Sequence, residues 1–219
     1  MNEKKDFDWW CGRAWIKFSC LLSALMVFLV LLNWRDWPDA RKLLAAVSAL
    51  IPVHVLEEWV FPGGFHYQYN CLMRSRVPDR YPMCRASDMF TNLSVTVFYM
   101  VLSFLPQCPG VLLGTMVFCF LETVMHTVFG ILMFLKFRSR GKTTVYGPGS
   151  ITAYWGFTVL GVLFCYELEG ARLVFTDWLA CAGVLLFILV IGILIPENIL
   201  KAEDSKYFFK SQGYYERFL

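Results

Sequence analysis

Long apolar blocks are the feature that most restricts how this chain can fold. Six blocks have about the 17–25 residues that a helix needs to cross a bilayer, and the fifth is the shortest. They occupy residues 15–33, 43–61, 89–105, 111–135, 151–166 and 173–195. Inside a bilayer every backbone polar group must be bonded within the protein, and a helix achieves this within each block. The chain is 58% hydrophobic and 17% charged, whereas soluble domains are about 45–50% apolar and about 25% charged. We therefore expect an all-α, polytopic membrane bundle of about six transmembrane helices.

The organisation expected from these blocks is one transmembrane domain with two short flanking segments. Residues 1–14 form an N-terminal segment, residues 15–198 form the six-helix domain, and residues 199–219 form an amphipathic tail. With the N-terminus inside, sixteen of the twenty Lys and Arg residues fall in cytoplasmic segments, so the positive-inside rule predicts that both termini are cytoplasmic. We expect a multi-pass protein of the cell membrane (inner or plasma membrane) in contact with membrane lipid. The net charge of +3 indicates no nucleic-acid partner, and no pattern predicts an oligomeric state.

Polar residues interrupt two of the apolar blocks in a regular way. The second block ends in PVHVLEEWVFPGG, which carries His54, Glu57 and Glu58, and the fourth contains FLETVMHTVFG, which carries Glu122 and His126. Residues three or four apart share one face of a helix, so each set lies on one flank of its helix. At ~1.5 Å per residue, the two histidines lie about 10 and 13 Å from the cytoplasmic face. We therefore expect the two sets to meet at similar depth.

The third block adds a weaker polar pair at the same end, Asp88 and Asn92, again four residues apart. Three helices thus direct polar side chains into the cytoplasmic half of the bundle. A charged group near mid-membrane costs ~2.5–3.5 kcal/mol on insertion scales, and such residues usually mark functional sites. The sequence therefore predicts a site between the second, third and fourth helices.

The motif HVLEE at residues 54–58 resembles the signature of the HXXEE family of membrane proteins. The family pattern also includes a later histidine and a Y-x-P-G element, which match His126 and the YGPG of residues 146–149 in the expected order. The resemblance covers most of the chain between His54 and Gly149. It implies no particular activity, because the family has no assigned function. Tyr146 is expected to lie over the polar site as a lid or hydrogen-bond donor, or else to belong to a simple turn before the fifth helix.

The first hypothesis for the polar residues is a metal-dependent membrane enzyme. Imidazole and carboxylate groups suit zinc, with iron or manganese as alternatives, and a catalytic zinc site takes three protein ligands and a water. We expect His54, His126 and one of Glu57 or Glu122 to be the metal ligands. Glu58 would act as general base on the bound water, with Tyr146 beside it. Hydrolysis of a lipid-like or membrane-embedded substrate fits this arrangement.

Three other interpretations remain open from the sequence. The same groups, without a metal, can move protons on a lipid double bond, as in an isomerase or cyclase. A six-helix subunit that binds or transports a small molecule or ion is also compatible with intramembrane charges. Finally, the histidines and glutamates can be interhelical hydrogen-bonding partners that only hold the bundle together.

Overall fold

The computed structural model describes residues 7–219, and these residues form helices without any β-strand. The helical segments in chain order are η1 (Trp10–Ala14), α2 (Trp15–Leu32), α3 (Asp39–Trp59), α4 (Phe65–Leu72), α5 (Arg85–Phe104), α6 (Pro109–Phe137), η2 (Arg138–Arg140), α7 (Ser150–Thr152), η3 (Ala153–Phe157), α8 (Thr158–Glu167), α9 (Phe175–Leu186), η4 (Phe187–Leu194), α10 (Ile195–Leu200) and η5 (Gly213–Phe218). Each of the six expected apolar blocks is therefore helical, which confirms the all-α class.

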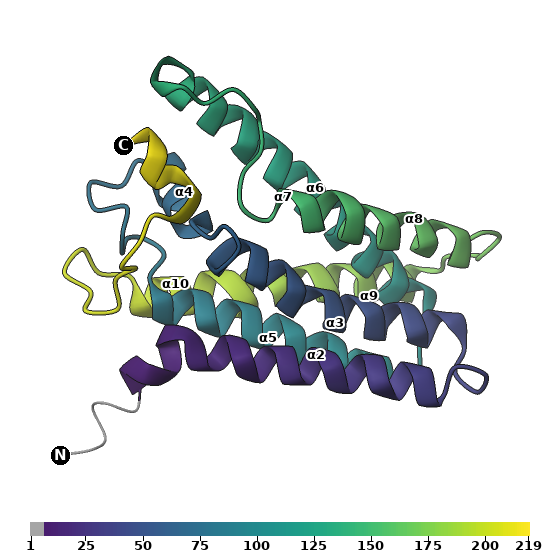
Figure 1. The fold of residues 1–219 in the computed structure, drawn as a ribbon. Helices are drawn as coiled ribbons and strands as arrows, with labels where there is room; N and C mark the ends of the chain where they lie inside the picture. Colours follow the sequence, from purple (N-terminus) through teal and green to yellow (C-terminus); the bar gives the residue numbers. More distant parts are fainter. Residues whose placement is uncertain (1–6) are drawn as a thin grey trace.

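The long helices pack side by side as a bundle (Figure 1). Helix α3 contacts α2, α5 and α8, and α6 contacts α8 and α9. The main core lies between them, and its buried members include Leu44 and Val47 of α3, Tyr99 of α5, Phe118 of α6 and Phe164 of α8. The packing places α3 and α6 where their polar residues can meet.

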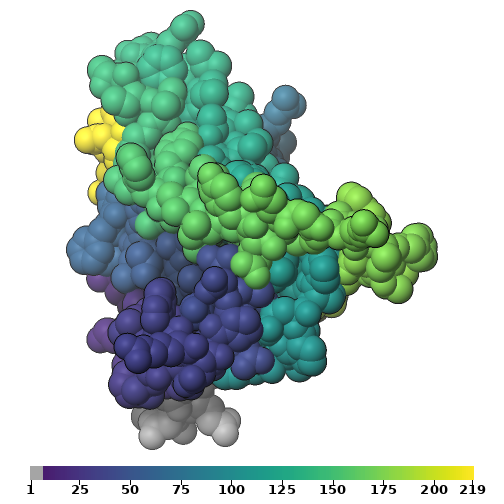
Figure 2. Space-filling view, turned by 90° about the vertical axis from the view of Figure 1, so that its right-hand side faces the viewer, coloured from purple at the N-terminus to yellow at the C-terminus, as the bar shows by residue number. Residues whose placement is uncertain are grey.

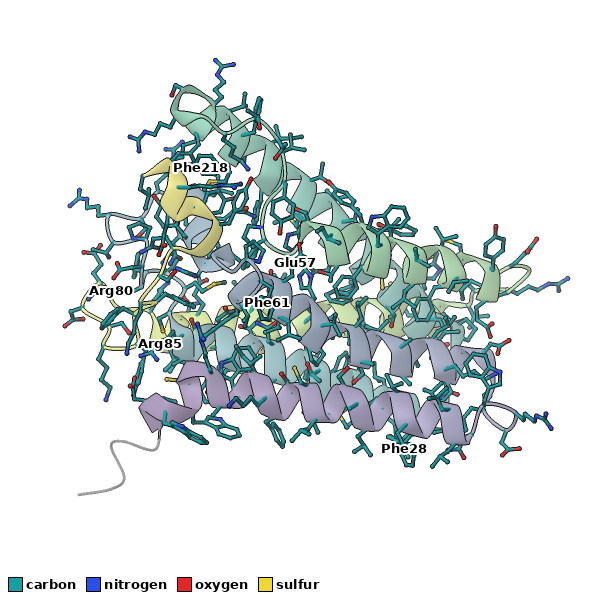
Figure 3. All side chains as sticks on the ribbon, viewed as in Figure 1. Phe28, Glu57, Phe61, Arg80, Arg85 and Phe218 are labelled. Atoms are coloured by element: carbon teal, nitrogen blue, oxygen red, sulfur yellow. The ribbon has the colours of Figure 1, made fainter. Side chains whose placement is uncertain are left out.

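Three helical stretches are long and apolar enough to cross a membrane: Phe7–Leu32, Pro109–Arg140 and Phe175–Leu200. This number is smaller than the six expected. The three other blocks, in α3, α5 and the continuous segment α7–η3–α8, are shorter and less apolar than these three. The outer surface of α2 is strongly apolar, with Leu21, Leu31 and Phe28 more than half exposed (Phe28 is labelled in Figure 3).

The first described helix, η1, and the C-terminal tail lie at one end of the bundle, together with α4 and the long connections (Figure 1). We call this end the termini end. Figure 2 views the opposite end, where the connections are short and the link between α8 and α9 projects to one side. At the termini end, the tail folds back onto α4 and the end of α6. Tyr215 of the tail is fully buried and donates to Gln68 of α4, and the buried Lys142 donates to the tail residue Tyr214 over 3.1 Å. The tail thus packs against the protein itself.

Candidate functional site

Four side chains from two helices converge between α3 and α6. The Nε2 atoms of His54 and His126 lie 3.1 Å apart. Glu58 Oε1 lies 3.3 Å from Nε2 of His54 and 3.5 Å from Nε2 of His126. Glu122 Oε2 lies 3.9 Å and 3.7 Å from the same two nitrogens. We refer to His54, Glu58, Glu122 and His126 as the His/Glu cluster.

The helical spacing of the sequence produces this cluster directly. His54 and Glu58 are four residues apart on α3, and Glu122 and His126 are four apart on α6, so each helix presents one imidazole and one carboxylate on one face. His54, Glu58 and His126 are at most 5% exposed, whereas the side chain of Glu122 is 29% exposed. The expected meeting of the two histidines at one level is therefore present in the fold.

The geometry of the cluster suits a metal ion. His54, Glu122 and His126 each offer one ligand atom, and these atoms lie within 4.8 Å of one another. Ligand atoms around a tetrahedral ion with bonds of ~2.0–2.1 Å are about 3.3–3.4 Å apart. The separations from 3.1 to 3.9 Å around the two histidines bracket this value. Two imidazoles and a carboxylate are also a ligand set that zinc accepts.

Glu57, which the sequence offered as an alternative ligand, is not part of this convergence. Its carboxylate instead accepts hydrogen bonds from the start of α7 (Figure 3). The amides of Ile151 and Thr152 donate over 3.0 Å and 2.8 Å, and the Thr152 hydroxyl donates over 2.6 Å. The first amides of a helix lack partners within the helix, and a carboxylate there satisfies them and favours the helix dipole. Glu57 therefore joins α3 to the beginning of the α7–η3–α8 segment.

Thr152 links Glu57 to the His/Glu cluster. Its hydroxyl lies 2.7 Å from Nδ1 of His54. Because that hydroxyl donates to the Glu57 carboxylate, it is an acceptor toward His54, and Nδ1 of His54 carries the proton. Nε2 of His54 then presents its lone pair to the cluster. Such an outer partner, which fixes the tautomer and ring orientation, commonly accompanies metal-bound histidines.

Tyr146 does not contact the cluster directly. Its hydroxyl donates to Glu57 Oε1 over 3.1 Å, and burial together with the neighbouring Glu57 raises the pKa of Tyr146 above its ordinary value. Gly149, in the same YGPG element, has φ of +92° and approaches the His126 ring. A Cβ on Gly149 would lie 2.2 Å from Cε1 of His126. The element therefore shapes one wall of the site, and glycine is required there for conformation and for space.

A cavity of about 180 Å³ opens beside the His/Glu cluster. All four cluster residues line one part of it. Its apolar walls come from several helices and include Ile51, Val95, Phe118, Phe129, Phe157 and Ile188. An apolar cavity of about 150 Å³ is large enough for benzene, so this one is large enough for a group of about that size and too small for a whole lipid. No Lys or Arg is among the lining residues.

Further polar groups line the same cavity. Asp88 accepts hydrogen bonds from Trp59 Nε1 over 2.6 Å and from Asn92 over 2.8 Å, so the expected Asp88–Asn92 pair is formed. Glu197 of α10 also lines the cavity and accepts from the Tyr69 hydroxyl over 2.7 Å. Sequence reasoning missed Glu197, Tyr69 and Thr152. Only Thr152 had a local signal, because it lies three residues after the YGPG element.

Comparison with known proteins identifies a family and nothing beyond it. A family model described as a protein of unknown function with HXXEE motif matches residues 45–164, which is more than half of the 219 residues. The matched range contains the whole His/Glu cluster together with Glu57, Tyr146 and Thr152. No curated protein and no solved structure matches the chain.

Proposed function

The chain belongs to the family of proteins of unknown function with the HXXEE motif, and we propose that it is a metal-dependent membrane enzyme that hydrolyses a lipid-like substrate. The observation that carries this proposal is the convergence of two imidazoles and two carboxylates, 3.1–3.9 Å apart, on the wall of an apolar cavity. Zinc suits the ligand set best, and iron or manganese would also be accepted.

The proposed roles within the cluster follow from position. His54, His126 and Glu122 would hold the metal, which when bound would lower the pKa of a water and polarise a carbonyl. Glu58, close to both imidazoles, is placed to act as the general base that accepts a proton. Glu57 and Tyr146, for which the sequence suggested a ligand and a catalytic group, act as positioning residues through Thr152.

The proposed substrate is lipid-like because the cavity walls are mostly apolar. The volume of about 180 Å³ admits only part of a lipid, so the remainder of the molecule stays in the bilayer. The lining contains carboxylates but neither Lys nor Arg, which favours an uncharged reacting group, such as an ester or amide, over a phosphate. A membrane lipid or another membrane-embedded molecule is therefore the proposed partner.

The proposed topology has six membrane crossings with both termini in the cytoplasm of the cell, in the inner or plasma membrane. It is supported by the three long apolar helices and by the position of η1 and the C-terminal tail at the same end (Figure 1). The connections 73–84 and 138–149 and the tail 201–219 lie at that end and carry many Lys and Arg residues, as cytoplasmic segments do. The three more polar segments then cross the bilayer with their polar faces turned inward.

A second candidate function is acid–base chemistry without a metal. It is favoured by the direct approach of the two Nε2 atoms, at 3.1 Å, and by the contact of Thr152 with the far side of His54 at 2.7 Å. A proton can pass along such a chain of hydrogen bonds to a lipid double bond. This candidate and the metal enzyme place the same residues at the same cavity and differ in metal content.

The test is elemental analysis of the purified protein after exposure to zinc, iron and manganese. We expect about one equivalent of metal in the wild type, and loss of that metal in His54→Ala and in His126→Ala. The matched control is His66→Ala, because His66 is equally buried but contacts Gln212 rather than the cluster. Absence of metal from the wild type refutes the metal enzyme and leaves the acid–base candidate. Equal metal in His54→Ala and the wild type also refutes it.

A further inference from the structure

A second cavity, of about 380 Å³, lies at the termini end of the bundle. Segments far apart in the sequence enclose it: η1, the end of α3, α4, the start of α5 and the tail. Its lining includes Trp59 and Val60 at the end of α3, His66 of α4, and Phe209 with Ser211 of the tail. It is separate from the His/Glu cluster, and the two cavities share no lining residue.

The charge of this cavity is opposite to that of the first. Arg13, Arg85 and Lys210 line it, and no Asp or Glu is among its lining residues. Arg13 and Lys210 are exposed, whereas Arg85 is only 8% exposed. The three basic residues come from η1, α5 and the tail, so the fold gathers them from distant positions.

Arg85 lines this cavity and has one donor atom without a partner. One terminal nitrogen of its guanidinium donates to Asp8 over 2.7 Å, but its Nε is buried and has no hydrogen-bond partner among residues 7–219. A buried donor without a partner is unfavourable, and such atoms usually mark a water, ion or ligand. The guanidinium fork matches the oxygen atoms of phosphate well.

We propose that this cavity binds a phosphate-bearing anion, with the guanidinium group of Arg85 as the central donor group and Arg13 and Lys210 at the rim. The aromatic rings of Trp59 and Phe209 and the apolar Val60 provide surface for the uncharged part of such a molecule. Either a phospholipid headgroup or a free phosphate compound carries the required chemistry. The site is independent of the proposed enzymatic function, because it uses none of the proposed metal ligands.

The test measures binding to the purified full-length protein with two probes. Titration calorimetry with inorganic phosphate reports the free anion, and native mass spectrometry after incubation with phosphatidylglycerol or phosphatidylcholine reports the headgroup. We expect Arg85→Gln to weaken binding at least about tenfold, since a charge-assisted hydrogen bond is lost. If Arg85→Gln fails to fold, the double variant Arg13→Gln/Lys210→Gln replaces it, because both of its residues are exposed. It should also weaken binding of the probe.

Arg80→Gln is the matched control, because Arg80 lies at the same end, pairs with Asp79 over 2.6 Å and does not line the cavity (Figure 3). Its binding should equal that of the wild type. Preference for phosphatidylglycerol without phosphate binding identifies the ligand as a lipid headgroup, and binding of phosphate identifies a soluble anion. The proposal is overturned if the wild type binds neither probe. It is equally overturned if the double variant binds like the wild type, or if Arg80→Gln weakens binding as much as the double variant.

Discussion

Replacement of Glu57 by glutamine separates the two glutamates of the motif. In the wild type, the Glu57 carboxylate accepts from the amides of Ile151 and Thr152, and from two hydroxyl groups. An amide side chain has one acceptor oxygen instead of two, so one of the two backbone amides loses its acceptor. A buried donor left without a partner costs about 1–3 kcal/mol, and loss of the negative charge at a helix start costs about 0.3–1 kcal/mol more. We expect Glu57→Gln to destabilise the fold by about 1–4 kcal/mol, from the sum of these terms.

The neighbouring Glu58→Gln variant is the matched control. Its carboxylate faces the two imidazoles at 3.3 and 3.5 Å and satisfies no backbone amide. Glutamine has nearly the same shape, so we expect a change of about 1 kcal/mol or less. The two variants make the same chemical change at adjacent residues. A difference in stability between them therefore reflects the different neighbours of the two side chains.

The assay is thermal unfolding in detergent, followed by hydrogen exchange in the folded state. For a chain of this size, 1 kcal/mol corresponds to roughly 2–4 °C in Tm, so Glu57→Gln should unfold roughly 2–16 °C below the wild type. The amides of Ile151 and Thr152 should also lose protection, whereas Glu58→Gln should retain it. Equal Tm values and unchanged protection in both variants would refute the assignment of Glu57 to the start of α7.

Two further changes test the site and the tail. Gly149→Ala should reduce metal content and lower stability by about 2–3 kcal/mol, because both the φ of +92° and the 2.2 Å approach to His126 are unfavourable for a Cβ atom. Gly141→Ala is the control, since Gly141 has a similar φ of +90° but open space around it. It should cost only about 1 kcal/mol and leave the metal content unchanged. Burial lowers the pKa of His66 to about 3, so the unfolded chain binds a proton at higher pH than the folded protein does. Stability therefore falls as the pH drops below the ordinary histidine pKa of 6.5. The loss of stability should reach about 2 kcal/mol at pH 5 relative to neutral pH. His66→Phe should lack this pH-dependent loss when its unfolding is measured at neutral pH and at pH 5.

The meeting of α3 and α6 was predictable from the sequence because it depends on helical spacing. His54 with Glu58 and Glu122 with His126 are each four residues apart, and helical geometry alone places each pair on one face. The cost of leaving such groups in lipid then requires that the two faces turn inward toward each other. This prediction did not depend on the loops or on the number of membrane-spanning helices, so it was correct even though the other two were not predicted well.

The role of Glu57 was not predictable in the same way. Its partners, the amides of Ile151 and Thr152, are more than ninety residues away, and backbone amides leave no mark in a sequence. The same applies to Glu197, which reaches the cavity only because α10 packs against α5. The tail was expected to be amphipathic, but periodicity cannot tell a membrane surface from the apolar groove beside α4 that the tail occupies.

The two adjacent glutamates of the motif have different neighbours for a geometric reason. Consecutive residues of a helix point about 100° apart, at 3.6 residues per turn. A glutamate four positions after His54 faces α6 and enters the cluster, so the preceding glutamate must face elsewhere, and on α3 that direction leads to the start of α7. Thr152 connects Glu57 to the far side of His54, because its hydroxyl donates to the Glu57 carboxylate and contacts Nδ1 of His54. One turn of α3 therefore supplies both the carboxylate inside the cluster and the carboxylate that orients its histidine, and neither can replace the other.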